Sequence, residues 1–190
     1  MRKNFVQDNR GFTLLEMLVV SAIFILTLTA VISIFVNTNR AQKRLANSEK
    51  LQADTRYVVE VMAREIRNGR IDYDNYTEGI DNPVSELKLL DYNDSAVWFR
   101  RAQSGNHNTI QVCRGSGCAN SEWYDITPDD ITVTQLKLFI SPNVDPFTLT
   151  GPNTQPLVHI GLTTQSLTPD LDEYKWIRYQ TAVTTRYYAR

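Results

Sequence analysis

The sequence carries little net charge, few metal-binding side chains and no motif of a common enzyme class. It has 20 Lys and Arg against 21 Asp and Glu, a net charge of −1, with two His and two Cys. A chain this close to neutrality has no bulk electrostatic attraction for nucleic acid or acidic lipid. A P-loop, a nucleophile elbow and a Ser-His-Asp order are all missing from the sequence. We therefore expect no enzymatic activity, no cofactor and no metal.

Charge is almost absent from one long segment near the N-terminus. Residues 12–36 hold a single charged side chain, Glu16. As a helix this segment would be about 37 Å long, enough to cross a hydrocarbon core of roughly 30 Å. A carboxylate inside such a segment is costly, so it indicates a function and a partner of opposite charge. Cutting the Gly11–Phe12 bond would create that partner, an α-ammonium group four residues before Glu16.

The flanks of this segment predict its orientation. Arg2, Lys3 and Arg10 precede it, so the positive-inside rule places the N-terminus in the cytoplasm and everything after residue 36 outside. An ordinary secretory signal has an apolar region of roughly 7–15 residues and then a small-x-small cleavage site. Here the apolar run is longer and ends in the polar residues 37–40. We expect a single-pass segment that stays in the cytoplasmic membrane.

A short motif at the start of the segment resembles a known processing signal. The hexapeptide Gly-Phe-Thr-Leu-Leu-Glu at residues 11–16 is similar to the class III signal of type IV prepilins and type II secretion pseudopilins. The resemblance implies that a prepilin peptidase cuts after Gly11 and methylates the new amino terminus, Phe12. It also implies that Glu16 meets the Phe12 amine of a neighbouring subunit in a filament. An i,i+4 contact between Glu16 and Phe12 of one chain is the alternative.

Two longer stretches carry a finer resemblance. Residues 51–67 resemble the second half of the helix in PilW-type minor pilins and type II secretion protein J, and residues 131–138 and 184–186 are similar to their late strands. The proline that many major pilins have in the membrane helix is missing, and Ser33 stands near that place. The resemblance implies a minor pilin whose N-terminal helix lies in membrane lipid before assembly and packs against other pilin subunits afterwards. The alternatives are a tip pseudopilin of a type II secretion system, with a secreted substrate as partner, and a membrane-anchored domain that binds a ligand or takes up DNA.

The helical pattern continues beyond the apolar segment. One stripe of an amphipathic helix follows spacings of three and four residues, and it consists of Leu51, Thr55, Val58, Met62 and Ile66. Asn68-Gly69 predicts the end of the helix, because Gly is favoured just past a helix C-terminus. The weak helix formers at residues 37–39 predict a place where the helix bends or frays.

The rest of the chain predicts strands. Short apolar runs at 97–99 and 109–112, and alternation at 158–163 and 177–187, are typical of half-buried strands. The apolar positions in 131–140 change phase between Val133 and Leu136, which predicts a bulge. Four prolines between residues 142 and 156 predict a loop. We expect the α+β class, with a long N-terminal helix packed on a single antiparallel sheet. The expected parts are a leader (1–11), a transmembrane or filament-core helix (12–36), an amphipathic helix (37–68) and a β-rich head (69–190).

Cys113 and Cys118 flank a four-residue, Gly-containing segment that predicts a hairpin loop with the cysteines facing each other across two strands. Because this part lies outside the cytoplasm, a disulfide is expected. Closing so short a loop stabilises by about 2 kcal/mol in the chain-entropy model. The alternative is a zinc site that adds His107 and His159, although the spacing lacks the paired Cys-x-x-Cys of zinc knuckles.

Two further clusters have both an ordinary and a functional interpretation. Acidic and amide side chains after the helix are either solvated or ligands for calcium: Asp72, Asp74, Asn75, Glu78, Asp81 and Asn82. Aromatic and basic residues near the C-terminus either belong to the core or stack on single-stranded DNA: Arg178, Tyr179, Arg186, Tyr187, Tyr188 and Arg190.

Overall fold

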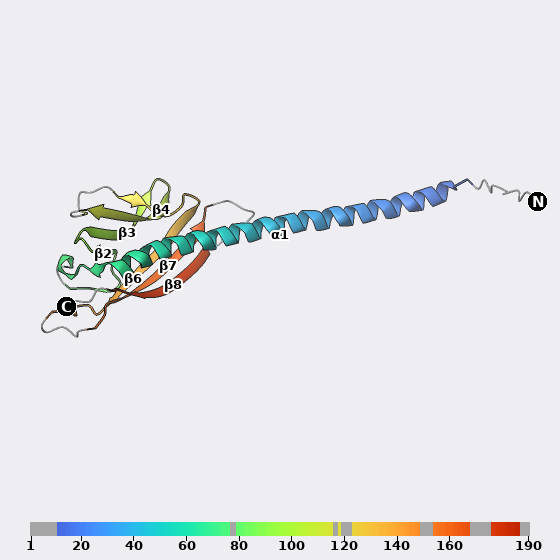
Figure 1. The fold of residues 1–190 in the computed structure, drawn as a ribbon. Coiled ribbons are helices and arrows are strands. Elements are labelled where there is room, and N and C mark those ends of the chain that lie inside the picture. The colour runs from blue at the N-terminus through green and yellow to red at the C-terminus, as the bar shows by residue number, and fades with distance from the viewer. Residues whose placement is uncertain are drawn as a thin grey trace, which may run out of the picture. The chain divides into compact units, whose positions relative to one another are not determined.

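The computed structural model describes residues 11–76, 79–115, 118, 123–148, 154–167 and 176–186. The chain divides into two compact units, Met1–Leu45 and Ala46–Arg190, and each is described by itself. One helix and eight strands are assigned, with a short 3-10 turn (η1) after β1 (Figure 1). Their bounds are α1 Leu14–Asn68, β1 Arg70–Ile71, η1 Tyr73–Asn75, β2 Glu86–Leu90, β3 Ala96–Ser104, β4 His107–Gly115, β5 Tyr124–Asp125, β6 Ile131–Ser141, β7 Leu157–Ser166 and β8 Trp176–Thr184.

The first unit consists of the N-terminal part of α1. Every residue from 11 to 45 is exposed, so this unit has no core of its own among the described residues. The predicted fraying at residues 37–39 is not observed, since the helix assignment continues through them. The helix ends at Asn68, as the sequence predicts.

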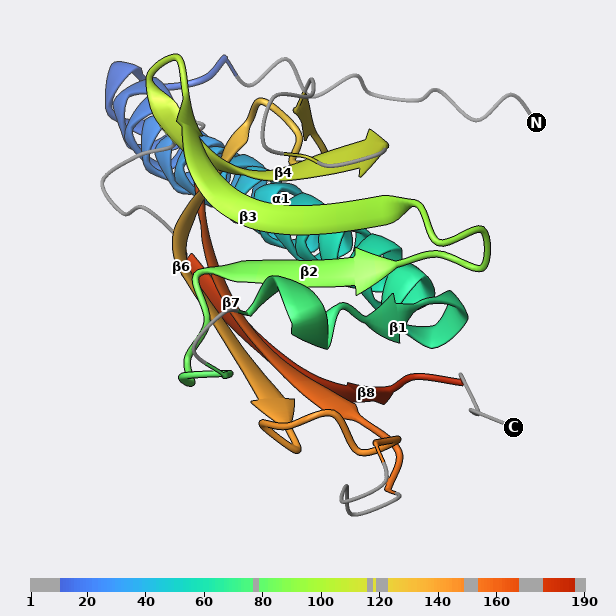
Figure 2. The ribbon, with the colours of Figure 1, turned by 90° about the vertical axis from the view of Figure 1, so that its left-hand side faces the viewer.

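The second unit packs the C-terminal part of α1 on antiparallel strands (Figure 2). The five-stranded sheet has the order β1-β2-β3-β4-β5, and the three-stranded sheet has the order β6-β7-β8. The pairing of β6 with β7 shifts register between Val133 and Gln135, which confirms the predicted bulge. The prolines after Ser141 lie between β6 and β7, also as predicted.

The α+β class is confirmed, but the strands form two sheets where the sequence predicted one. Strand β6 meets β3 and β4 without a backbone ladder, and hydrogen bonds between side chains and backbone link them instead. The Thr132 hydroxyl accepts a hydrogen bond from the Asn108 amide at 3.0 Å, and Arg101 Nε donates to the Val133 carbonyl at 2.8 Å. These side-chain bonds occupy backbone groups that a continuous sheet would have paired.

The predicted stripe of α1 forms one side of the core. Leu51, Thr55, Val58, Met62 and Ile66 are each at most 1% exposed. The largest buried cluster joins this side of α1 to both sheets. It includes Leu87, Phe99 and Ile110 of the five-stranded sheet and Leu138 and Ile160 of the three-stranded sheet. Burying one such side chain contributes about 1.5–3 kcal/mol. The alternation predicted for the last strands is also present, because Val158, Ile160, Leu162 and Val183 are buried.

Gly69 ends the helix for a reason that the sequence did not reveal. Its backbone is outside the left-handed region that helix-ending glycines often adopt. A β-carbon at Gly69 would instead lie 2.7 Å from the carbonyl oxygen of Leu90 on β2 and 3.0 Å from that of Glu65. Glycine is therefore required by the close approach of the chain that leaves α1 to strand β2.

Candidate processing and assembly site at the N-terminus

Helix α1 begins two residues after the predicted cleavage point. Gly11 and Phe12 are exposed and precede the helix, and the Phe12 side chain is 77% exposed. Thr13 caps the first turn, because its hydroxyl accepts a hydrogen bond from the Glu16 amide at 3.3 Å. The carbonyl of Thr13 accepts from the Met17 amide at 3.2 Å. The Thr-x-x-Glu spacing is the sequence signature of a capping box, of which only the Thr13 half is formed in the described part of the chain.

The hydroxyl groups of the apolar segment find partners inside the helix. Ser21 donates to the Leu18 carbonyl at 2.9 Å, and Thr27 donates to the Phe24 carbonyl at 2.8 Å. Thr29 donates to the Ile25 carbonyl at 2.7 Å. These bonds satisfy hydroxyls without water, as a lipid or protein environment requires.

Glu16 differs from those hydroxyls. Its carboxylate lies in the first turn, where the helix dipole favours negative charge, yet no ion pair or hydrogen bond holds it within the described part of the chain. The apolar side chains around it are exposed, including Leu15 at 73% and Leu18 at 61%. This surface therefore combines a wide apolar area with one carboxylate that has no partner among the described residues.

The comparison with protein families matches this region. Residues 7–32 match the model of the prokaryotic N-terminal methylation motif. The chain carries an N-terminal methylation motif. The match supports the assignment of this chain to the type IV pilin-like and pseudopilin subunits. It does not bear on the resemblance of residues 51–67 to PilW-type minor pilins and protein J. No curated protein and no solved structure matches the chain.

The methylation motif overlaps the start of α1, which is long and apolar enough to cross a membrane by length and composition. No second helix of this kind occurs in the described ranges. Arg2, Lys3 and Arg10, on which the predicted orientation depends, lie outside the described residues.

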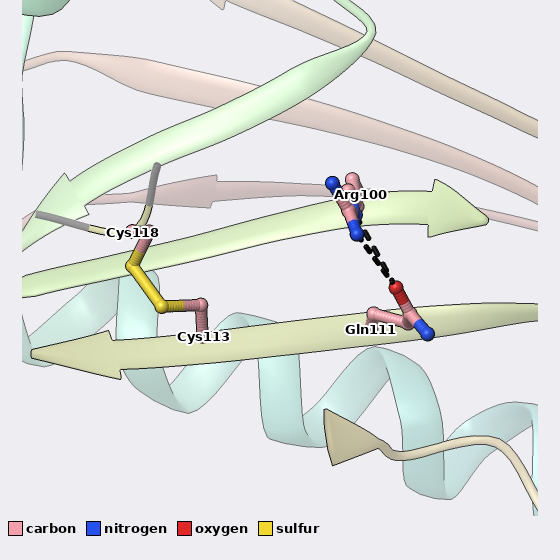
Figure 3. The surroundings of a disulfide bond; sticks show 4 residues. All are labelled: Arg100, Gln111, Cys113 and Cys118. Carbon is pink, nitrogen blue, oxygen red and sulfur yellow. Dashed lines mark hydrogen bonds between the residues drawn. A yellow bond between two sulfur atoms is a disulfide. The ribbon is translucent and has the colours of Figure 1, made fainter. Parts of the chain in front are cut away.

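The head contains the disulfide that the sequence predicts, between Cys113 and Cys118 (Figure 3). The predicted cross-strand placement was wrong, because Cys118 lies in a turn and the next strand beside β4 is β5. The disulfide packs with Ala96, Trp98 and Trp123 in a small cluster of its own. Because both sulfur atoms are bonded to each other, they are not available as the zinc ligands of the alternative interpretation.

Polar contacts support the sheet face that carries this disulfide. Cys113 and Gln111 are two positions apart on β4 and therefore share one face of the strand. Gln111 accepts two hydrogen bonds from Arg100 on β3, at 3.2 and 3.1 Å (Figure 3). The Arg100 guanidinium lies 3.8 Å from the centre of the Trp123 ring. These contacts stabilise the pairing of β3 with β4 and the disulfide loop beside it.

The remaining candidate sites are only partly assembled. Asn82, one proposed calcium ligand, instead exchanges two hydrogen bonds of 2.8 Å with the backbone of Ile140. Among the described residues, no three His, Cys, Asp or Glu side chains lie close enough to hold a metal ion. Arg178 and Tyr179 alternate along β8, with Arg178 exposed and Tyr179 packed against the core, so they do not form one stacking surface. Glu78, Tyr187, Tyr188 and Arg190 lie outside the described residues.

Proposed function

We propose that this chain is a non-enzymatic structural subunit of a type IV pilus-like filament, and that it assembles through its N-terminal helix. The observation that carries the proposal is the methylation motif at residues 7–32, continued by an exposed apolar helix with one unpartnered carboxylate. Such a surface is stable only when lipid or other helices cover it. Membrane lipid would cover it before assembly, and the helices of neighbouring subunits would cover it afterwards.

We further propose that a prepilin peptidase removes residues 1–11 and methylates Phe12. The exposed, non-helical position of Gly11 and Phe12 supports this, because the bond between them is not protected by helical hydrogen bonds. The remaining parts are then a membrane or filament-core helix (12–36), an amphipathic helix (37–68) and the head (69–190). The N-terminus starts in the cytoplasm with the head outside, and the mature chain enters a filament in the periplasm or at the cell surface.

Cleavage would place an α-ammonium group at the positive end of the α1 dipole. That charge is unfavourable there, and Thr13 already caps the first turn. The Glu16 carboxylate offers the compensating charge, either within one chain or toward the Phe12 of a neighbour. Moving Glu16 into a helix bundle without a partner would cost several kcal/mol, so pairing would select correctly staggered subunits.

Within this class we infer a minor pilin of the PilW type, on the likeness of residues 51–67 and the lack of proline in the apolar segment. A tip pseudopilin resembling protein J is the alternative within the class. The two differ in phenotype: deletion of a secretion pseudopilin leaves a secreted enzyme inside the cell, whereas deletion of a minor pilin changes the number of pili.

Intact mass of the protein from membranes tests the processing step. In a host with an active prepilin peptidase, we expect loss of residues 1–11 and addition of one methyl group. Gly11→Val should leave the chain at full length, while Thr13→Val, next to the site, should still be cut. Full-length, unmethylated wild-type protein would overturn the proposal.

The fraction of protein in sheared filaments tests the role of Glu16. We expect Glu16→Gln to be anchored and cleaved but at least tenfold depleted from filaments, since the variant keeps the shape and loses the charge. Glu49→Gln is the matched control, because Glu49 is an exposed carboxylate on the same helix outside the apolar segment. Equal incorporation of both variants would remove charge pairing from the proposal.

A further inference from the structure

A partly open cavity in the head lies where β1 and η1, the end of β2, the loop after β6 and the residue after β8 come together. Its volume is about 130 Å³. The residues around it are Arg70, Ile71, Asp72, Tyr73, Asp74, Leu90, Asp145, Phe147, Pro156 and Thr185. An apolar cavity of about 150 Å³ holds a benzene molecule, so this slightly smaller cavity has room for a group smaller than benzene.

One buried polar group in the cavity wall has no partner. Thr185 is 1% exposed, and its hydroxyl oxygen makes no hydrogen bond within the described part of the chain. The backbone of Thr185 is fixed, because its amide donates to the Pro156 carbonyl at 3.2 Å. A buried hydroxyl without a partner costs free energy comparable to a lost hydrogen bond, so its presence beside a cavity indicates a ligand or a bound water.

The other polar groups of the cavity are mainly hydrogen-bond acceptors. Asp72 is 4% exposed, Asp145 is half-buried and Asp74 is exposed, so carboxylates extend from the interior to the opening. The Tyr73 hydroxyl is unavailable as a donor, since it bonds to the Pro142 carbonyl at 3.1 Å. Arg70 also lines the cavity, but its guanidinium is engaged at 2.7 Å by Asp94, which lies outside it.

The charge balance favours a cation. Three carboxylates and one guanidinium line the cavity, a formal charge of 1 − 3 = −2. Burial, and then the negative charge of Asp145, raise the pKa of Tyr73 well above its usual range. Tyr73 and Phe147 add aromatic rings, and an aromatic face attracts ammonium and guanidinium groups.

From these observations we propose that the cavity binds a guanidinium or ammonium group. Such a group has several N–H donors, which match the Thr185 hydroxyl oxygen and the carboxylates of Asp72 and Asp145. A single bare metal ion fits less well, because the acidic side chains in the described ranges are too far apart to ligate one together. The inference is independent of the proposed role in a filament, since it uses only groups within the head.

Isothermal titration calorimetry on the full-length protein in a mild detergent tests the proposal. The probes are N-acetyl-arginine amide and N-acetyl-lysine amide, with N-acetyl-citrulline amide as a neutral molecule of nearly the same shape as the first. We expect the two cationic probes to bind at least tenfold more tightly than the citrulline probe. Agmatine, which lacks the backbone amides, distinguishes the two sources of the group: tighter binding of agmatine indicates a free small molecule, and tighter binding of the arginine amide indicates a side chain of a partner protein.

Two substitutions locate the binding site. Asp145→Asn keeps the oxygen that accepts from the Phe147 amide and removes the charge, so we expect at least tenfold weaker binding. Thr185→Val removes only the hydroxyl, and we expect about fivefold weaker binding, the effect of one hydrogen bond, with unchanged or higher thermal stability. Asp81→Asn is the control, because Asp81 is exposed and outside the cavity wall. Equal binding of the citrulline probe, equal effects of Asp81→Asn and Asp145→Asn, or no binding of any cation would overturn the proposal and leave a hydrated cavity.

Discussion

A pair of buried hydroxyl groups between α1 and β7 allows a prediction whose size follows from the structure. Thr55 and Thr164 are both 0% exposed, and their hydroxyl oxygens lie 2.6 Å apart. The Thr55 hydroxyl also bonds to the Leu51 carbonyl at 2.7 Å. Because a hydroxyl has one proton and a carbonyl has none, Thr55 must donate to Leu51 and Thr164 must donate to Thr55.

This direction makes the two threonines unequal. Thr55→Val takes away the acceptor of Thr164 and leaves a buried donor unsatisfied, which should cost about 1–3 kcal/mol of unfolding free energy. Thr164→Val leaves the bond from Thr55 to Leu51 intact and should cost about 0.5–1.5 kcal/mol. The double Val variant has no buried hydroxyl at this place, so its stability should be near that of the wild type.

The assay is urea unfolding of the full-length protein in a mild detergent, followed by tryptophan fluorescence. The change in midpoint at constant m-value gives each difference in unfolding free energy. Thr134→Val serves as the matched control, since the Thr134 hydroxyl makes a 3.1 Å bond to the Thr163 carbonyl on the exposed side of the same sheet. If the double variant loses the sum of the two single losses, the two hydroxyls are not coupled and the assigned direction is wrong.

Three further predictions concern the stability of the head. Replacing both Cys113 and Cys118 by Ser should lower the unfolding free energy by about 2 kcal/mol from loop entropy alone, and an unchanged urea midpoint would contradict a stabilising role for the disulfide. Burial, and then the charge of Asp130, raise the pKa of Asp54 above its usual 3.8, against the opposing effect of the nearby Lys50. When an acid has a higher pKa in the folded state, the protein loses unfolding free energy as pH rises through that pKa. Asp54→Asn should therefore be more stable than the wild type at pH 7 and equal to it below about pH 3. An equal difference at both pH values would refute this. Gly69→Ala should lower the thermal midpoint, at a cost of about 1–3 kcal/mol, because the added carbon meets backbone atoms that cannot move aside.

Local features of this protein were predictable because neighbouring residues determine them. The methylation motif and the apolar segment occupy consecutive residues, so no folding knowledge is needed to find them. The buried stripe of α1, the bulge after Val133 and the loop after Ser141 follow from helical and strand periods and from proline geometry. The disulfide was predictable because only five positions separate its cysteines.

Features that join distant segments needed the tertiary structure. Thr55 and Thr164 are separated by 109 positions, and no local pattern marks them as partners. The division of the strands into two sheets depends on the side chains of Arg101 on β3 and Thr132 on β6, which bond to backbone groups of β6 and β4 at the junction. The need for glycine at position 69 comes from Leu90, a residue of another element.

The same contrast separates the two sites. Glu16 and Phe12 stand one helical turn apart, so the sequence by itself determined that a carboxylate and a potential amino terminus lie together at the start of an apolar helix. The cavity proposed to bind a cation is lined by residues at positions 70–74, 90, 145, 147, 156 and 185, which are ordinary loop and strand residues when read in order. Only the folding of the head brings their carboxylates and the Thr185 hydroxyl to one place, because burial and proximity are properties of the folded chain.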